Sequence, residues 1–388
     1  MRKHELVREH IKRVQNRYRE ATRYQKGIIL NELCQTWDLD RKYVIKLLCG
    51  NTPPKGGKKL GRQSKYDIRL EKHLLFIWNQ MERISGKRMK AALAIWLPFY
   101  KAQDFTTDLR QQLLKMSPAT LERWIQRAQK RFEKGKSTTT RPKFFRYKIP
   151  LFDGVTRDIS YPGHVHADTV AHCGESLIGQ FANTLTVTDR LSQWTENAAL
   201  PNKEAKNMKL ALIKVEERIP FRLRSFQNDC GTEFLNYTVV DYFERRPHPV
   251  SVVRSRPYHK NDNAHVEQKN FTHVREIFGY ERYTGEELVN RMNSIYENLW
   301  NPLNNFFLPS MRLETKTRIG ARIKKKYEKP KTPYQRLMEC RHLDDISKAR
   351  LKRTYESLNP FDLKRELERQ LDEFFRLARR QKIEQTAA

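Results

Sequence analysis

Residues 164–170 read His-Val-His-Ala-Asp-Thr-Val, a short run in which polar residues alternate with small or apolar ones. Alternation over seven residues is typical of a half-buried β-strand. Asp168 lies inside this predicted strand, between Ala167 and Thr169, where carboxylates are uncommon. The segment therefore predicts a first strand and, within it, a charged side chain that needs a physical reason.

Beyond residue 170 the pattern continues as strands and then alternates between helices and strands. The further predicted strands are Leu177–Arg190, Trp194–Leu200, Phe221–Asn228 and Val250–Ser255, and the predicted helices are Lys203–Arg218, Phe234–Arg245, Asn263–Phe278 and Gly285–Phe306. This order predicts an α/β domain with a mixed five-stranded sheet and flanking helices. Strands one and four would run parallel at its centre, and sites in open α/β sheets lie at the carboxyl ends of such strands.

Two more acidic residues fall where this sheet would bring them towards Asp168. Asp229 directly follows the fourth predicted strand, with 60 residues between it and Asp168, and Glu267 lies beyond a further 37 residues, on the helix after the fifth strand. Three carboxylates in one small region repel one another unless cations are bound. Oxygen ligands suit Mg²⁺ or Mn²⁺, whereas zinc favours His and Cys. We therefore predict that Asp168, Asp229 and Glu267 are catalytic and bind two such ions, which flank a phosphodiester.

Together these pieces resemble the catalytic core of DDE transposases and retroviral-type integrases, which has an RNase H-like fold. The resemblance rests on Asp168, on the stretch Asn-Asp-Cys-Gly-Thr-Glu-Phe at 228–234, and on Glu267 followed by Asn270. It covers residues 160–310 and implies an insertion-sequence DNA transposase or integrase. Such a protein binds transposon ends, cleaves 3′ ends with bound metal and transfers the strand into target DNA. Because two ends are handled together, it also implies a homodimer or higher homo-oligomer.

The sequence departs from this family pattern in a few places. Cys230 follows Asp229 where many relatives have Asn, and the His/Cys zinc module of retroviral integrases is missing. The 37 residues between Asp229 and Glu267 slightly exceed the usual spacing of these integrases, a difference that a loop before the helix can absorb.

Several other core residues have two interpretations. Asp189, after a predicted strand, is interpreted as a turn residue, with a metal ligand as the alternative. Asp262 and Glu233 suit helix starts. Three histidines have two equally good explanations: His164, His166 and His172. They contact DNA or Asp168, or they pack in an ordinary strand with one buried face.

The chain outside the core is strongly basic. Its 388 residues include 76 Lys and Arg against 45 Asp and Glu, a net charge of +31. Residues 1–150 carry +23, residues 151–310 carry −2 and residues 311–388 carry +10. With 38% hydrophobic residues the chain is expected to fold rather than to be a disordered polycation. A basic excess on both sides of a neutral core predicts a nucleic-acid partner, duplex DNA of the element's terminal repeats and of the target.

The predicted domains follow these charges. They are a helix-turn-helix DNA-binding unit (1–51), a basic linker (52–65), a second helical or helix-turn-helix region (66–133), a linker (134–155), the RNase H-like core (156–310) and a small basic C-terminal domain ending in a helix (311–388). A plain helical hairpin and a solvated charged face are the alternatives for the two helical regions. The predicted DNA contacts are Arg41, Lys42, Lys58, Lys59, Arg62, Thr120, Arg123, Arg127, Lys260, Asn270, Arg275, Lys324 and Lys325.

Other protein classes are disfavoured. The longest apolar run, Ala91–Tyr100, has ten residues, whereas a membrane-spanning helix needs about 20. No signal-peptide pattern opens the chain, and five scattered cysteines predict neither disulfides nor a zinc site. We therefore expect a soluble intracellular protein, cytoplasmic or nucleoid-associated, with no membrane partner. The alternatives in function are a domesticated or inactive DNA-binding regulator, and an RNase H-type nuclease. The predicted recognition helices argue against the RNase H-type nuclease, because such helices fit the major groove of B-form DNA and not that of A-form duplexes.

Overall fold

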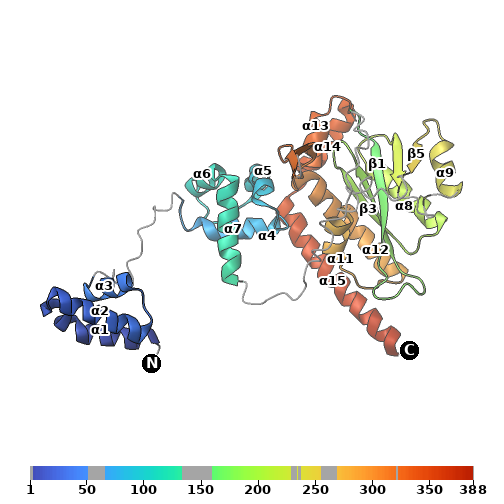
Figure 1. The fold of residues 1–388 in the computed structure, drawn as a ribbon. Helices are drawn as coiled ribbons and strands as arrows, with labels where there is room; N and C mark the ends of the chain where they lie inside the picture. Colours follow the sequence, from blue (N-terminus) through green and yellow to red (C-terminus); the bar gives the residue numbers. More distant parts are fainter. Residues whose placement is uncertain are drawn as a thin grey trace. The chain divides into compact units, whose positions relative to one another are not determined.

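The computed structural model describes residues 3–50, 66–132, 160–228, 234, 237–254, 269–319 and 322–387. The chain divides into two compact units, Met1–Lys65 and Tyr66–Ala388 (Figure 1). Among the described helices, none combines the length and the apolar character needed to cross a membrane.

The N-terminal unit is a three-helix bundle of α1 (Lys3–Glu20), α2 (Arg23–Trp37) and α3 (Arg41–Leu48). Asp38 adopts a left-handed conformation (φ 53°) that ends α2, and the Asp40 side chain caps α3 by accepting from the backbone N–H groups of Lys42 and Tyr43. The bundle buries apolar side chains from all three helices: Val7, Ile11, Ile29, Leu30, Leu33, Val44, Leu47 and Leu48. The two helices expected to meet near residues 37–40 are therefore present, joined by a tight turn.

Residues 66–132 form a second helical group. It contains α4 (Leu70–Gln80), α5 (Gly86–Trp96), the short turn η1 (Leu97–Phe99), α6 (Thr107–Lys115) and α7 (Pro118–Phe132). Gly86 opens α5, and its N–H donates to Oε2 of Glu122 at 2.6 Å. A Cβ on Gly86 would lie only 2.6 Å from the carbonyl oxygen of Pro118, so this close contact between α5 and α7 requires glycine.

The central sheet confirms the predicted fold class. Its strands are β1 (His164–Ala171), β2 (Asn183–Asp189), β3 (Thr195–Leu200), β4 (Ser225–Asn228) and β5 (Ser251–Arg254), in the order β3-β2-β1-β4-β5. The first three strands pair antiparallel, while β1 pairs parallel with β4 and β4 with β5. This is the mixed, RNase H-like arrangement expected, with β1 and β4 adjacent at the centre.

Helices flank this sheet. They are α8 (Ala205–Arg218), α9 (Tyr237–Glu244), the π-helical turn η4 (Asn270–Arg275), α11 (Glu276–Phe278), α12 (Glu286–Ile295) and the π-helical turns η5 (Tyr296–Trp300) and η6 (Leu303–Phe307). Helices α8 and α12 and the turn η5 pack on β3, and η4 packs on β1. The candidate site therefore lies where η4 meets the central strand.

The second strand begins later than predicted, at Asn183 rather than Leu177. The cause is Arg282, whose guanidinium donates to the backbone oxygens of Cys173, Ser176, Ile178 and Gln180 and holds this segment as a loop. Carbonyls that bind a guanidinium cannot at the same time accept ladder hydrogen bonds from a neighbouring strand.

The C-terminal residues form a hairpin of β6 (Leu313–Ile319) and β7 (Arg322–Tyr327), followed by α13 (Pro333–Glu339), α14 (Asp345–Ser357) and α15 (Pro360–Ala387). The helices pack on the core rather than forming a body of their own: Phe374 of α15 meets Phe278 and Tyr283 with ring centroids 5.0 Å apart in each pair. Leu363 and Leu367 are buried on the same helix, as ordinary packing predicts.

The helical group 66–132 shares this hydrophobic core. Trp96 is fully buried, donates from its indole N–H to the carbonyl oxygen of Phe307 at 3.0 Å and packs against Phe361 of α15. The predicted regions 66–133, 156–310 and 311–388 thus lie within one compact unit, because their apolar faces cover one another.

Candidate active site

Asp168 lies half-buried on the central strand β1, opposite Thr186 of β2. Its Oδ1 accepts from the backbone N–H of Thr169 at 2.7 Å, and its Oδ2 accepts from Nδ2 of Asn270 at 2.6 Å. Two donors from two directions fix the carboxylate in place. The strand therefore presents one oriented acid at the centre of the sheet, beside the first residue of η4.

Asn270 is the residue that connects η4 to the predicted triad. Its Nδ2 is used by Asp168, while its Oδ1 is buried and accepts no hydrogen bond within the described residues. A buried amide oxygen without a donor is costly unless a cation or a water is bound to it. The π-helical form of η4 also fits, because such turns occur frequently at functional sites.

Arg275, five residues further along the same turn, performs a different task. One guanidinium nitrogen donates to the carbonyl oxygen of Ala171 at 2.9 Å, another donates to that of Gly279, and the guanidinium lies 4.7 Å from the centroid of the Tyr280 ring. These contacts fasten η4 to the end of β1. The phosphate contact expected of Arg275 stays a prediction.

Two basic side chains lie together at the start of η4. Nζ of Lys269 lies 3.2 Å from Nε2 of His273, and burial lowers the pKa of Lys269 to about 7, with further lowering from the charges of Arg88 and Arg336. Burial likewise lowers the pKa of His273 well below its usual value. Both shifts favour the neutral forms of these side chains.

The two other predicted triad members, Asp229 and Glu267, lie outside the described residues. So do four predicted DNA contacts (Lys58, Lys59, Arg62 and Lys260) and the alternatives Glu233 and Asp262. In the described part of the chain, no three His, Cys, Asp or Glu side chains are grouped as a metal site would require. The oxygen donors that are described, the Asp168 carboxylate and Oδ1 of Asn270, are of the type that Mg²⁺ and Mn²⁺ prefer.

The structure gives Asp189 a structural task. The side chain is buried, and it accepts from the backbone N–H of Gly163 and from both the N–H and the hydroxyl of Ser192. Burial raises its pKa, although these hydrogen bonds act in the opposite direction. The carboxylate thus organises the β2–β3 turn, as the turn interpretation predicts.

The strand histidines are likewise explained by packing. His164 Nδ1 lies 2.8 Å from the Ser225 hydroxyl, and His172 Nε2 lies 2.8 Å from the hydroxyl of Thr184. Burial lowers the pKa of His172 to about 3, so this imidazole is neutral at physiological pH. His166 is buried as well.

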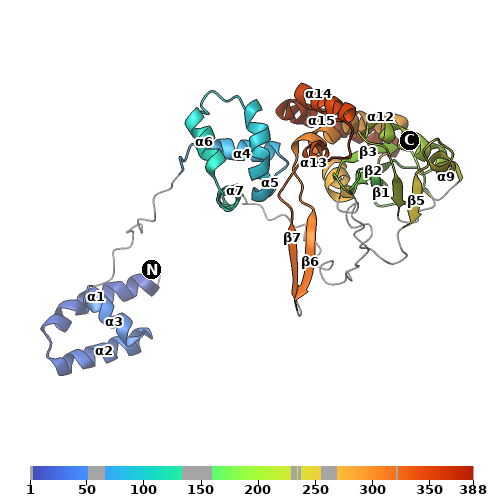
Figure 2. The ribbon, with the colours of Figure 1, turned by 90° about the horizontal axis from the view of Figure 1, so that it is seen from above.

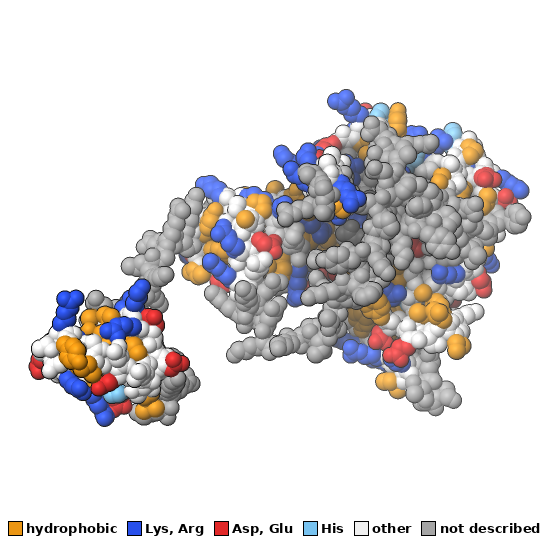
Figure 3. Space-filling model, in the orientation of Figure 1, with side chains coloured by type: hydrophobic (Ala, Val, Ile, Leu, Met, Phe, Trp, Pro, Cys, Tyr) orange, Lys and Arg blue, Asp and Glu red, His pale blue; other side chains and the backbone are white. Residues whose placement is uncertain are grey.

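The described DNA-contact candidates other than Asn270 and Arg275 lie on three surface elements. Arg41 and Lys42 are exposed at the start of α3, Arg123 and Arg127 are exposed on α7 beside half-buried Thr120, and Lys324 and Lys325 are exposed on β7. Arg123 donates to the Thr120 hydroxyl at 3.1 Å, which links these two candidates. Figure 3 shows Lys and Arg side chains on the surfaces of α1–α3 and of α4–α7.

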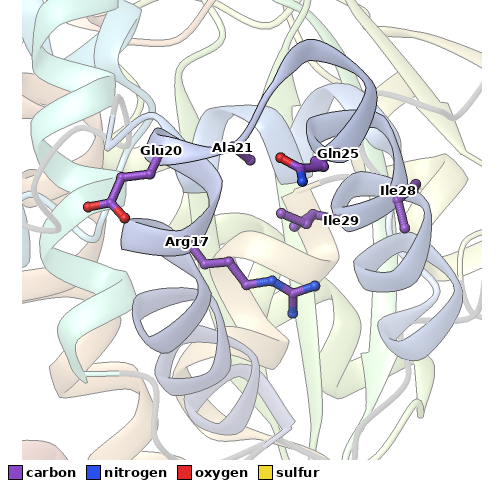
Figure 4. A pocket seen from close by; sticks show the side chains of 6 residues that line it. All are labelled: Arg17, Glu20, Ala21, Gln25, Ile28 and Ile29. Atoms are coloured by element: carbon purple, nitrogen blue, oxygen red, sulfur yellow. The ribbon is translucent and has the colours of Figure 1, made fainter.

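A hollow in the N-terminal unit lies between the end of α1 and the start of α2 (Figure 4). One basic and one acidic side chain line it together with smaller and apolar ones: Arg17, Glu20, Ala21, Gln25, Ile28 and Ile29. None of the predicted site residues belongs to it.

Sequence reasoning missed a buried polar network on β3. Glu196 accepts from the Trp194 indole, from Arg218 and from Asn301, and burial raises its pKa while the charge of Arg218 opposes that rise. Its position as a carboxylate inside the predicted strand Trp194–Leu200 is the signal that could have indicated it. The network ties α8 and the segment between η5 and η6 to the edge of the sheet.

The fold and this site define a class: a protein with an RNase H-like α/β core, an oriented carboxylate on the central strand and helical units before the core. A comparison with protein-family models finds no match. The chain is 33% identical over 331 residues to a protein named uncharacterized protein y4rM, from Sinorhizobium fredii (strain NBRC 101917 / NGR234). The match covers 82% of this chain and 91% of that protein, so the chain belongs to the same family.

Similar solved structures are retroviral. The catalytic core of BIV integrase aligns at 13% identity with a TM-score of 0.29, over 46% of this chain and 96% of that one. The HTLV-2 integrase catalytic core in complex with magnesium aligns at 12% identity with a TM-score of 0.24, over 30% of this chain and 69% of that one. A chain of the simian T-cell lymphotropic virus intasome aligns at 12% identity with a TM-score of 0.26, over 30% of this chain and 40% of the intasome chain.

Proposed function

We propose that this chain is a DNA transposase or integrase that binds the ends of a mobile element, cleaves 3′ ends and transfers them into target DNA. The observation that carries the proposal is the place of Asp168. It lies on the central strand, oriented by two donors, next to the parallel strand whose last described residue directly precedes Asp229.

The register of these two strands supports the assignment of Asp229. Paired residues of β1 and β4 differ by 61 positions, as His164 and Ser225 do, and the same 61 positions separate Asp168 from Asp229. Neighbouring residues at equal register in parallel strands point to the same face of a sheet. Glu267 is supported by its position three residues before Asn270, which contacts Asp168.

Asp168, Asp229 and Glu267 are the residues that would hold two Mg²⁺ or Mn²⁺ ions, because carboxylate oxygens are suitable ligands. Such ions, when bound, supply activation of a water or a 3′-hydroxyl and stabilisation of the leaving oxygen. Asn270 orients Oδ2 of Asp168.

The basic flanks supply the DNA contacts in this proposal. Helices α3 and α7 and the strand β7 present Arg41, Lys42, Arg123, Arg127, Lys324 and Lys325 for phosphates and bases of duplex DNA. Two element ends must be joined to one target, so we infer a homodimer or larger assembly on DNA. The protein would act in the cytoplasm or at the nucleoid.

Oligonucleotide duplexes taken from the DNA that flanks the gene test this proposal, with the full chain and with Mg²⁺, Mn²⁺ or EDTA. We expect metal-dependent nicking and strand transfer, both abolished in Asp168→Asn, Asp229→Asn and Glu267→Gln while DNA binding persists. Asp241→Asn on α9, a half-exposed aspartate paired with Arg245, is the matched control and keeps wild-type activity. Turnover of the Asp168→Asn protein would refute the assignment, and end-specific binding without cleavage would indicate the inactive-regulator alternative.

A further inference from the structure

The β6–β7 hairpin is the most strongly basic element of the described core unit. Residues 313–327 contain six basic side chains and one acid, Glu314. Every described side chain of its two strands is exposed. Figure 2 shows the two strands side by side, running away from the sheet and from helices α13 and α14. A ribbon of two strands is marginally stable alone in water, so its survival here needs an explanation.

A buried ion-pair network anchors the root of the hairpin. Glu328 accepts from Arg312 and Arg336, and the side chains of Glu328 and Arg336 are only 13% and 5% exposed. Arg312 also donates to the carbonyl oxygen of Leu191 at 2.6 Å, and Arg336 donates to that of Ser192 at 3.2 Å. The ribbon is thus fixed at its base to the β2–β3 turn, while its distal part extends outward.

The pairing of the strands sets one lysine directly against another. The register places Lys316 opposite Lys325, while Lys324 lies opposite Thr317. Like charges directly across a sheet are destabilising. Among the described residues, the hairpin carboxylate Glu314 pairs with Lys326, and Lys324 and Lys325 are exposed on β7.

We propose that this hairpin is an arm that enters the major groove of the bound duplex. This inference rests on the proposed DNA function. The major groove, about 12 Å wide, admits a two-stranded β-ribbon, whose strands lie about 4.8 Å apart. Phosphates on both sides of the groove would neutralise the opposed lysines. Seven residues of strand extend over roughly 20 Å, the length of about six base pairs.

Other polyanions fit less well. The exposed apolar side chains Leu313 and Tyr327 lie opposite each other at the root, and the exposed Ile323 of β7 stands between Arg322 and Lys324 in the sequence, so the strands present no continuous apolar face to a lipid surface. The major groove of A-form RNA is deep and narrow and excludes such a ribbon. Duplex DNA is therefore the partner that matches the width and charge of the arm.

The test is the salt dependence of binding of the full chain to duplex DNA, for wild type and for Lys324→Gln/Lys325→Gln. The matched control is Arg350→Gln/Arg353→Gln, two exposed arginines on α14 of the same unit. Each phosphate contact contributes about 0.9 to the slope of log affinity against log salt, so the hairpin variant should lose about 1.8 of that slope. Between 50 and 200 mM salt its affinity should fall about tenfold less than that of wild type. The control and Lys324→Arg/Lys325→Arg should keep the wild-type slope.

Three outcomes would refute the proposal that the hairpin is a DNA-binding arm. One is a hairpin variant with the wild-type slope while wild type still cleaves and binds, which leaves the proposed function intact. Another is unchanged binding to a duplex whose major groove is filled by glucosylated hydroxymethylcytosine. The third is an equal effect of the variant on duplex RNA or on anionic vesicles. If the wild-type chain binds no duplex DNA, that result refutes both the arm proposal and the proposed function.

Discussion

Asn270 donates a hydrogen bond from Nδ2 to Oδ2 of Asp168, and the two atoms are 2.6 Å apart. The bond joins the central strand to the π-helical turn η4, which begins three residues after Glu267 in the sequence. Residues that hydrogen-bond to a metal ligand fix its orientation. We therefore predict that Asn270 is a positioning residue for the proposed metal site.

Asn270→Ala removes this donor and frees the carboxylate of Asp168 to rotate. We expect the Mg²⁺ concentration for half-maximal cleavage to rise, or cleavage to fall, by roughly 10- to 100-fold, because outer partners of metal ligands have effects of this size. The measurement is a Mg²⁺ titration of the nicking rate. Asn298→Ala is the control, because Asn298 is exposed and bonds only within its own helix, to Ser294. An Asn270→Ala protein with the wild-type Mg²⁺ profile and rate would exclude the positioning role.

The ion-pair network at the hairpin root gives a prediction for stability. Glu328→Gln leaves the buried guanidinium of Arg336 without its carboxylate, and breaking a buried pair costs about 3 kcal/mol. Urea denaturation of the full chain measures this loss. Glu339→Gln, which breaks the exposed pair with Lys331, should cost under about 1 kcal/mol. Equal losses in the two variants would show that the network contributes no more than a surface pair.

The same carboxylate predicts a pH dependence. Burial acts to raise the pKa of Glu328, but the charges and hydrogen bonds of Arg336 and Arg312 outweigh it, so the pKa lies below its ordinary value of 4.5. The unfolded chain therefore binds this proton first as pH falls, and the contribution to stability, present above pH 4.5, is lost as pH drops through the lower folded value. The stability difference between wild type and Glu328→Gln should shrink below pH 4.5 and stay constant between pH 6 and 7. A constant difference down to pH 3 would contradict the assignment.

The two compact units predict the result of a deletion. Removal of residues 1–65 takes away a bundle with its own apolar core, so the main thermal transition of the remaining chain should move by less than about 2 °C. Affinity for element ends should fall, because Arg41 and Lys42 are lost with α3. Circular dichroism and gel-shift titration measure the two effects. A large drop in melting temperature would show that the deleted unit stabilises the rest.

Sequence patterns predicted the core strands because each strand is a short local run bounded by turn residues, although β2 and β3 are buried along their whole length rather than on alternate residues. The first and third strands were placed within one residue of β1 and β3, and the parallel pairing of β1 with β4 was correct. The second strand was predicted six residues too early, since the loop before it is held by Arg282, more than a hundred residues away in sequence. No periodicity reveals a side chain that binds four distant carbonyls.

The candidate site was predictable only in part for the same reason. Asp168 was identified by its place in a strand, and Asn270 by its spacing from Glu267, but their hydrogen bond depends on how η4 packs on the sheet. The π-helical turn changes the angular spacing of side chains, so α-helical counting could not reveal that the Arg275 guanidinium donates to the carbonyl oxygen of Ala171. The phosphate contact of Arg275 stays a prediction. The packing of the helical group 66–132 and the C-terminal helices on the sheet could not be predicted, because an apolar stripe does not reveal which partner covers it.

A substitution of Trp96 tests whether the helical group 66–132 and the sheet share one hydrophobic core. Its indole is fully buried and donates to the Phe307 carbonyl oxygen, so Trp96→Ala should lower the free energy of unfolding by about 3 to 5 kcal/mol. If α4–α7 and the sheet share one core, urea unfolding followed by fluorescence and circular dichroism should show one coincident transition for residues 66–388, shifted as a whole. The exposed Phe76→Ala serves as a milder control on α4. Two separate transitions, of which only one moves in Trp96→Ala, would mean that the helical group folds independently of the sheet.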